Sequence, residues 1–216
     1  MKKITQRLQG VPEPTVRRLP NYLTHLKSVA NNDVEYISAP QIARNLDLDP
    51  TQVTKDLAYT GISGKTKIGY KIEDLTRALE EFLGYNRTNL AFLVGAGNLG
   101  SALLKYEGFA VSGFKIVAAF DTDLEKVGQK IGDIDILHLD KFKNLTERLH
   151  CQIGIITTPA EVSQSVAEMM ISWGIKAIWN FTPVTIRVPS GIIIENTSIY
   201  SNLAVIINKL DQANKD

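Results

Sequence analysis

The amino-acid sequence predicts an α/β protein with an N-terminal winged helix-turn-helix domain and a C-terminal domain built on a doubly wound parallel sheet. Two short segments with helix-capping residues, between positions 38 and 59, indicate the first domain. A glycine-rich turn after an apolar run, and the alternation of strand-like and helix-like segments beyond it, indicate the second. A length of 216 residues accommodates both, because a domain typically spans roughly 100 to 200 residues.

The composition is that of an ordinary globular chain, with 22% charged and 44% hydrophobic residues and a net charge of +1. No apolar run approaches the roughly 18 residues of a membrane span, and the N-terminus lacks a signal-peptide pattern. We therefore expect a cytoplasmic protein without membrane association. The single cysteine, Cys151, cannot form an internal disulfide, and no His/Cys cluster suggests a metal site. Residues 1–27 carry an excess of positive charge, which suits binding to a polyanion. This segment contains one acidic residue, Glu13, and six basic ones: Lys2, Lys3, Arg7, Arg17, Arg18 and Lys27.

The first element expected is an amphipathic helix over residues 14–30, where apolar residues recur every three or four positions. Pro20 lies inside this helix and should kink it. A further helix, with leucines at positions 75, 79 and 83, should close the domain before a linker at residues 84–89.

The helix-turn-helix is predicted from two capping patterns. Ser38 followed by Gln41 forms a capping box, and Asp49-Pro50 supplies an N-cap and a proline at the first helical position. The outer face of the second helix carries Thr51, Gln52, Thr54 and Lys55, side chains that can meet base edges or phosphates in the major groove.

Residues 61–75 alternate around glycines and carry Lys65, Lys67 and Lys71, which fits a β-hairpin wing beside the groove. A small helical bundle that does not bind DNA would show similar capping and spacing, but the lysine-bearing wing favours DNA.

The second domain begins with the strand-like run at residues 89–94, which leads directly into the turn Gly95, Ala96, Gly97, Asn98, Leu99 and Gly100. In the fold that binds dinucleotides, such glycines allow a tight turn, close approach to the pyrophosphate, and close packing of helix on strand. Asp121 ends the next strand, 21 residues after Gly100. A carboxylate there accepts hydrogen bonds from the ribose hydroxyls and repels a 2′-phosphate, so NAD(H) is favoured over NADP(H).

Three more apolar strands are expected, near residues 134–139, 153–157 and 177–181, in the alternation of a Rossmann domain. The turns after the last two contain Thr158 and Pro159, and Asn180 and Phe181. Because carboxyl strand ends frame the ligand in such sheets, we expect these four residues to contact the nicotinamide half of the cofactor.

A nicotinamide dehydrogenase would need a proton donor near the reacting carbon, such as His, Lys or Tyr. None of the three histidines follows a strand end expected to frame nicotinamide, and no second large domain remains to hold a substrate. We therefore expect a protein that senses the cofactor and is not an enzyme. A small NAD-dependent oxidoreductase with an N-terminal dimerisation segment is the alternative, and a cofactor-binding protein that has lost DNA binding is a third reading.

The chain resembles the bacterial redox-sensing transcriptional repressor family Rex over nearly its whole length. The motifs RRLPNYL, QVTKDLAYTG, VGAGNLGSALLKYEGF, IVAAFDTDLEKVG and TTPAEVSQSVAEMMISWGIKAIWNFTP occur in the family's order. The resemblance implies a homodimer with a winged helix, a Rossmann domain and a last helix swapped into the partner. It further implies that NADH removes the dimer from palindromic operator DNA, whereas NAD⁺ competes and permits binding. We place the domains at residues 1–85, 86–196 and 197–216, the last being the swapped helix.

The resemblance also suggests site residues. At the DNA we expect Arg17, Arg18, Tyr22, Gln52, Thr54, Lys55, Tyr59, Lys65 and Lys67, with Thr54 standing where the family usually has arginine. Rex proteins commonly have an arginine at the position of Thr24 and an aspartate at the position of Ser198, which with the tyrosine at Tyr106 form a charge network that favours the DNA-binding state. Thr24, Tyr106, Ser198 and the adjoining Ile199 are thus the candidate switch residues, and both charged groups are absent here.

Overall fold

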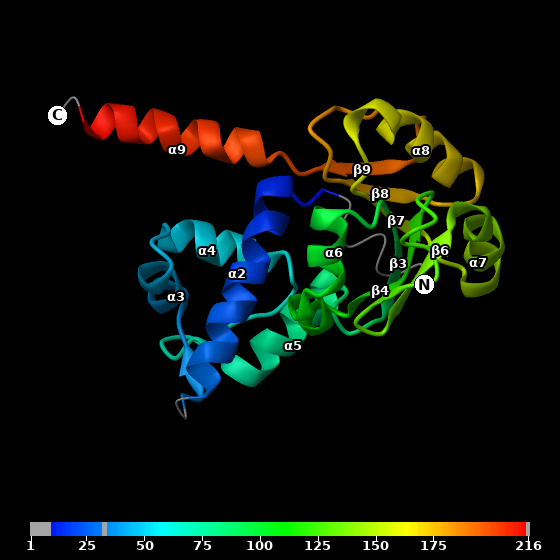
Figure 1. Cartoon of the computed structure of the whole chain (residues 1–216). Helices are drawn as coiled ribbons and strands as arrows, with labels where there is room; N and C mark the ends of the chain where they lie inside the picture. The colour runs from blue at the N-terminus through cyan, green and yellow to red at the C-terminus, as the bar shows by residue number, and fades with distance from the viewer. Residues whose placement is uncertain (1–9, 32–33, 215–216) are drawn as a thin grey trace. The chain divides into compact units, whose positions relative to one another are not determined.

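The computed structural model describes residues 10–31 and 34–214, apart from the side chain of Ile199. The chain divides into two compact units, Met1–Arg87 and Thr88–Asp216. Figure 1 shows the helices of the first unit in blue to teal and the sheet of the second in green to orange.

The first unit contains four described helices and a small sheet. The helices are α2 (Glu13–Ala30), α3 (Ala39–Asn45), α4 (Pro50–Ala58) and α5 (Ile72–Leu83), and strands β1 (Tyr36–Ile37) and β2 (Tyr70–Lys71) pair antiparallel. The predicted caps are confirmed: Ser38 and Gln41 form a capping box, and the Asp49 carboxylate accepts from the backbone N–H of Gln52. Pro20 lies within α2, where it has no N–H to donate.

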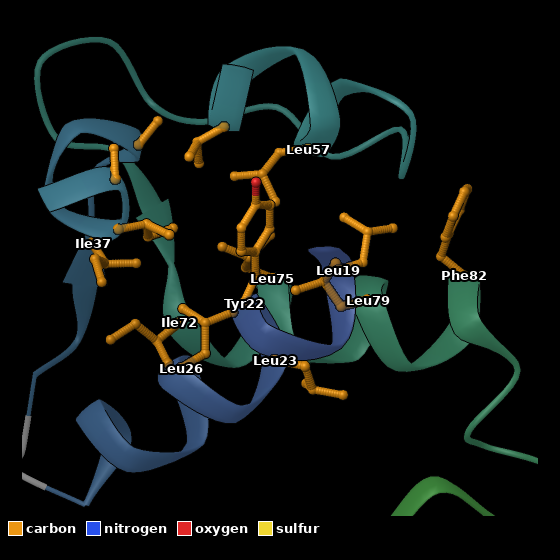
Figure 2. Packing of buried hydrophobic residues seen from close by; sticks show 14 residues of the cluster. Leu19, Tyr22, Leu23, Leu26, Ile37, Leu57, Ile72, Leu75, Leu79 and Phe82 are labelled. Carbon is orange, nitrogen blue, oxygen red and sulfur yellow. The ribbon is translucent and has the colours of Figure 1, made fainter. Parts of the chain in front are cut away.

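A single apolar core holds these helices together (Figure 2). Leu19, Leu23 and Leu26 project from one face of α2 and pack with α4 and α5. Leu57 of α4 belongs to the same cluster, so the outward face of α4 is oriented by the core beneath it.

The wing predicted in residues 61–75 is present as a short hairpin. Lys65 and Gly69 exchange two backbone hydrogen bonds across a tight turn, and β2, which follows directly, pairs with β1. Gly69 has a φ of +104°, and a Cβ there would overlap the carbonyl oxygen of Ile37. The close approach of the turn to β1 therefore requires glycine at this position.

The second unit is a seven-stranded sheet in the order β5-β6-β4-β3-β7-β8-β9. Its strands are β3 (Asn89–Val94), β4 (Phe114–Asp121), β5 (Lys130–Ile131), β6 (Ile134–His138), β7 (Ile153–Ile156), β8 (Ala177–Asn180) and β9 (Ile193–Asn196). All neighbours pair in parallel except β5 with β6. The connecting segments include α6 (Asn98–Leu104), η1 (Glu107–Ser112), η2 (Leu139–Lys141), α7 (Phe142–Leu149) and α8 (Ala160–Ser172).

The order from β6 to β9 is the doubly wound order of dinucleotide-binding sheets, with β3 as first strand and the reversal between β3 and β7. The five strands that the sequence predicted are present, and β5 and β9 are additional. Successive residues of β3 alternate between the two faces: Phe92 packs in one core and Leu93 in the other. Cys151 is buried in the first of these cores, and burial raises the pKa of its thiol to about 11.

The last helix, α9 (Ile199–Ala213), is capped by Ser198, whose hydroxyl accepts from the backbone N–H of Ser201. The large apolar side chains that the structure describes on α9 are exposed by between 48% and 70%: Tyr200, Leu203, Val205, Ile206, Ile207 and Leu210. Such a continuous uncovered apolar surface on a helix is characteristic of an interaction face.

Candidate functional sites

A pocket of about 560 Å³ lies where the strand order reverses, at the carboxyl ends of β3, β4 and β7. Of the residues predicted for the cofactor, it is lined by Gly95, Gly97, Asp121, Thr158 and Pro159. The residues that sequence reasoning missed there are Val94, Thr122, Lys126, Leu139, Thr157, Val162 and Val166. Topology brings these segments together, since the ligand crevice of an open α/β sheet forms at this reversal.

The three glycines of the turn differ in what surrounds them. A Cβ on Gly95, whose φ is +104°, would lie 2.8 Å from the backbone of Thr157, and a Cβ on Gly100 would overlap the carbonyl oxygen of Gly95. At Gly97, however, a Cβ would meet nothing within 4 Å. The fold itself thus requires Gly95 and Gly100, whereas the space left by Gly97 opens on the pocket and fits the close approach of a pyrophosphate.

The Asp121 carboxylate is hydrogen-bonded to the glycine turn. Its carboxylate accepts hydrogen bonds from the backbone N–H groups of Ala96 and Asp123, both at 2.9 Å. The Lys126 ammonium lies 3.4 Å from Asp121 and 3.1 Å from Asp123. The predicted acidic residue is therefore in place at the pocket wall, and Lys126 follows it by five positions in the chain.

Thr158, which lines the pocket, has a side-chain hydroxyl without a hydrogen-bond partner among the described residues. Its Oγ1 is buried, although such buried hydroxyls are nearly always paired. The adjacent Thr157 is occupied differently, since its hydroxyl donates to the carbonyl of Gly95 at 2.7 Å and ties the β7 turn to the glycine turn. An orphan hydroxyl beside an open glycine turn is what a site for a polar ligand should contain.

Two predicted contacts are not placed at this pocket. Asn180 is fully buried, its amide nitrogen donates to Val184 and Asn196, and its oxygen accepts from Thr182. Phe181 packs against Trp179, with ring centroids 4.7 Å apart, and does not line the pocket. Asn180 is thus a structural residue of the loop after β8, because its polar atoms are already satisfied.

In the turn itself, Ala96 is buried and contributes its backbone N–H to Asp121, whereas Asn98 and Leu99 are exposed at the start of α6.

The outward face of α4 carries the predicted DNA-contacting residues. Thr54, Lys55 and Tyr59 are exposed, and Gln52 is half-buried. The Thr54 hydroxyl donates to the carbonyl of Pro50 at 2.9 Å. In the turn of the wing, Lys65 and Lys67 are exposed; the Lys65 ammonium lies 5.2 Å above the Tyr36 ring, and Lys67 has a left-handed φ of 64°.

Tyr22 was expected at the DNA, but the structure places it inside the core. It is fully buried, and its hydroxyl, which points toward α4 in Figure 2, donates to the Asp56 carboxylate at 2.7 Å. Arg18 is tied to the same carboxylate at 2.7 Å, and its side chain is only 23% exposed. Arg17 is exposed and pairs with Glu13 at 2.8 Å. The basic residues at positions 2, 3 and 7 lie outside the described residues.

Asp56 is a buried carboxylate at the centre of this cluster. Burial works to raise its pKa, but hydrogen bonds from Arg18, Tyr22 and Thr15 outweigh burial and hold the pKa below its ordinary range. No local sequence pattern indicates this cluster, because Asp56 and its partners lie 34 to 41 positions apart.

Each unit of the chain matches a known protein family. Residues 86–184 match the family described as "CoA binding domain", and residues 10–58 match "Putative DNA-binding protein N-terminus". The redox-sensing transcriptional repressor Rex of Bacteroides thetaiotaomicron is 46% identical over 201 residues, which cover 93% of this chain and 91% of that protein. This chain belongs to the Rex family. The Rex of Treponema denticola is 43% identical, over 92% of this chain and 95% of its own.

Solved Rex structures have the same fold. The crystal structure of RSP in complex with β-NAD⁺ and operator DNA has a TM-score of 0.89 at 32% identity, covering 94% of each chain. The structure of RSP with β-NADH has a TM-score of 0.85 and covers 95% of this chain and 96% of that one. The family resemblance and the fold class predicted from the sequence are confirmed.

The candidate switch residues of this Rex chain lie on three separate elements. Thr24 is exposed on α2 and donates to the carbonyl of Pro20, Tyr106 is 60% exposed before η1, and Ser198 caps α9. Ile199 begins α9, but its side chain lies outside the description. Within residues 10–31 and 34–214, no group of His, Cys, Asp and Glu could hold a metal ion. The described helices also include none of the length and apolarity that crossing a membrane requires.

Proposed function

We propose that this Rex-family protein is a cytoplasmic, homodimeric repressor that binds NAD(H) in the β3/β7 pocket and leaves palindromic operator DNA when NADH binds. The observation that carries the proposal is that one chain holds both an exposed α4 face and a pocket with a glycine turn, an acidic strand end and an orphan hydroxyl. Its solved relative RSP is described with β-NAD⁺ and operator DNA, and also with β-NADH.

The proposal includes the absence of catalysis. The ionisable side chains among the described pocket residues are Asp121 and Lys126, and these two are paired with each other at the ribose end, next to the glycine turn. A hydride-transfer enzyme would need a proton donor at the other end, near the nicotinamide. The alternative, a small NAD-dependent oxidoreductase, would be supported by turnover of NADH with a carbonyl substrate.

The coupling between pocket and DNA is thermodynamic. NADH can release DNA only if it binds the DNA-free arrangement of the dimer more tightly than the DNA-bound one, and DNA must weaken NADH binding by the same factor. We propose that α9, whose apolar surface is uncovered in the single chain, packs against the partner subunit in this dimer.

Fluorescence anisotropy tests the proposal. Palindromic duplexes are selected from a randomised library with the purified protein, and the tightest one is titrated with protein alone, with NADH and with NAD⁺. We expect NADH to lower the affinity and NAD⁺ to preserve it. The proposal is wrong if no duplex is selected, or if NADH leaves the affinity unchanged.

Replacement of Asp121 should reduce the preference for NADH over NADPH. Asp121→Asn keeps an oxygen that can accept from Ala96 N–H but removes the charge that repels a 2′-phosphate, whereas Asp121→Ala also releases the glycine turn. By calorimetry, we expect Asn to narrow the gap between the two cofactors and Ala to weaken NADH further. Equal affinities of the wild-type protein for NADH and NADPH would contradict this role of Asp121.

Removal of the lysines Lys55, Lys65 and Lys67 should weaken DNA binding at every sequence alike. A phosphate contact contributes about 0.9 to the slope of log affinity against log salt concentration, so each true contact should lower the slope by about that amount. Lys67→Asn is preferred to alanine, because asparagine tolerates the left-handed φ of this residue. Lys143→Ala, on α7 of the other unit, removes the same charge as a control. Unchanged slopes in the triple variant would rule out this DNA face.

Restoration of the missing charges should strengthen the response to NAD⁺. A charged hydrogen bond is worth about 1.5–3 kcal/mol, so its absence can shift an open/closed ratio by roughly ten- to a hundredfold. Thr24 is exposed, and aspartate at position 198 can still cap α9, so Thr24→Arg with Ser198→Asp should be tolerated by the fold. A double-mutant cycle on operator affinity, with and without NAD⁺, measures the coupling. A large NAD⁺ enhancement in the wild type, or no coupling in the double variant, would show that other contacts set the switch.

A further inference from the structure

We propose that Asp56 and Arg18 lock the side-chain amide of Gln52 so that it presents only N–H donors, which makes Gln52 a reader of guanine in the operator. This inference rests on the proposed DNA-binding function and adds a specificity to it. It is carried by a hydrogen-bonded chain of three side chains that runs from the interior of the first unit to the surface of α4.

The inner end of the chain is rigid. The Asp56 carboxylate accepts from Arg18 Nε at 2.7 Å and from Arg18 Nη2 at 2.9 Å, a two-point contact that sets the plane of the guanidinium. The Tyr22 hydroxyl donates to the same carboxylate at 2.7 Å and the Thr15 hydroxyl at 2.8 Å. Asp56 is only 3% exposed, so water does not compete with these four bonds.

The outer end of the chain is the Gln52 amide. Only one of its two orientations pairs donors with acceptors: with Oε1 toward Arg18, it accepts from Nη1 at 3.0 Å and from Nη2 at 2.9 Å. The opposite orientation would set the amide N–H groups of Gln52 against the N–H groups of a cation that has no acceptor to offer. Arg18 therefore occupies the carbonyl oxygen and leaves the amide nitrogen of Gln52 as its outward group.

This orientation changes what the side chain can read. A free glutamine recognises adenine by donating to N7 and accepting from the N6 amino group. With Oε1 engaged by Arg18, Gln52 cannot accept from N6, and it retains two N–H donors. Guanine presents two adjacent acceptors, N7 and O6, in the major groove, and is the base that a donor-only group fits best. Gln52 lies on α4 between exposed Thr51 and Lys55, in the row expected to face that groove.

The test uses the full-length protein and the palindromic duplex selected from a randomised library. Each guanine of a half-site is replaced in turn by 7-deazaguanine, which lacks the N7 acceptor, and each adenine by purine, which lacks the N6 amino group. We expect one guanine per half-site at which the wild-type protein loses about tenfold in affinity and Gln52→Ala loses nothing. Loss at an adenine lacking N6, abolished by Gln52→Ala, would overturn the locked orientation.

Two further variants test whether Arg18 sets the orientation of the Gln52 amide. Gln52→Glu can still accept from Arg18 with one carboxylate oxygen, but it presents an acceptor outward, so the preferred base should change from guanine to cytosine, whose N4 amino group donates. Arg18→Met removes the guanidinium and frees the amide to rotate, so adenine should become acceptable at the same position. An unchanged preference for guanine in both variants overturns the inference while DNA binding itself stands. If the wild-type protein selects no duplex, the proposed function fails first.

Discussion

Asp56→Ala should destabilise the N-terminal unit by about 3 kcal/mol, because it removes the acceptor of four buried or half-buried hydrogen bonds. Loss of one partner of a buried ion pair typically costs about 3–5 kcal/mol. The lower end applies here, since Arg18 is 23% exposed and can turn toward water. The buried Tyr22 hydroxyl cannot, and it would remain without an acceptor.

The two tryptophans allow the effect to be localised. Trp173 and Trp179 both belong to the second unit, so their fluorescence reports on that unit alone. We therefore follow urea unfolding by far-ultraviolet circular dichroism and by tryptophan fluorescence. For Asp56→Ala, a transition at lower urea concentration than in the wild type should appear in circular dichroism but not in tryptophan fluorescence. The matched change Tyr22→Phe removes one bond and should cost about 1 kcal/mol. Equal shifts of both signals would mean that Asp56 does not act locally.

The stability contributed by Asp56 should depend on pH. The folded-state pKa of Asp56 lies below the value of about 3.9 expected for an unfolded aspartate, so ionised Asp56 stabilises the fold. This stabilisation is complete above the unfolded pKa and is lost as pH falls through the folded one. The difference in unfolding free energy between the wild type and Asp56→Asn should thus be constant near neutral pH and shrink below about pH 4. A difference that grows on acidification would contradict the assignment.

Gly100→Ala and Gly97→Ala should separate the two uses of the glycine turn. A Cβ at Gly100 overlaps a backbone oxygen that cannot rotate away, so we expect the stability of the second unit to fall by about 3 kcal/mol, at the upper end of the cost of overpacking. A Cβ at Gly97 meets nothing within 4 Å, and its φ of −78° suits alanine, so the stability should change by less than about 1 kcal/mol. The same methyl group would stand where we place the pyrophosphate.

Tryptophan-monitored unfolding and calorimetry with NADH measure the two effects. Gly97→Ala should lower NADH affinity at least about tenfold, or 1.4 kcal/mol, in a protein of nearly unchanged stability. Gly100→Ala should lose both stability and binding. Full NADH affinity in Gly97→Ala would show that the cofactor does not use the space above this glycine.

Local signals in the sequence predicted the helices and strands well. The caps at Ser38 and Asp49 are interactions between residues three positions apart, so they can be predicted from the local sequence, and both occur as expected. The glycine turn and Asp121 could also be predicted from the local sequence, because each has a fixed spacing from a strand end.

Interactions between residues far apart in the sequence could not be predicted from local patterns. Tyr22 was expected to contact DNA although it lies three positions from Leu19 and four from Leu26, on the buried face of α2. Its polar group concealed this, since the partner that makes burial tolerable, Asp56, belongs to another helix. Asn180 was misplaced in the same way, because its oxygen and nitrogen are satisfied by a loop whose course no motif announces.

Because we propose that the exposed apolar surface of α9 packs against a second copy, the stability of the folded chain should depend on protein concentration. Burial of Leu203, Ile206 and Leu210 against a second copy would stabilise the folded chain only as far as mass action supplies that copy. Dilution should then lower the midpoint of thermal unfolding, whereas variants that shorten α9 should unfold at a lower temperature and with a weaker dependence on protein concentration. In a cell, copy number would tune the regulator together with the cofactor, so that a change in expression alone could shift the response.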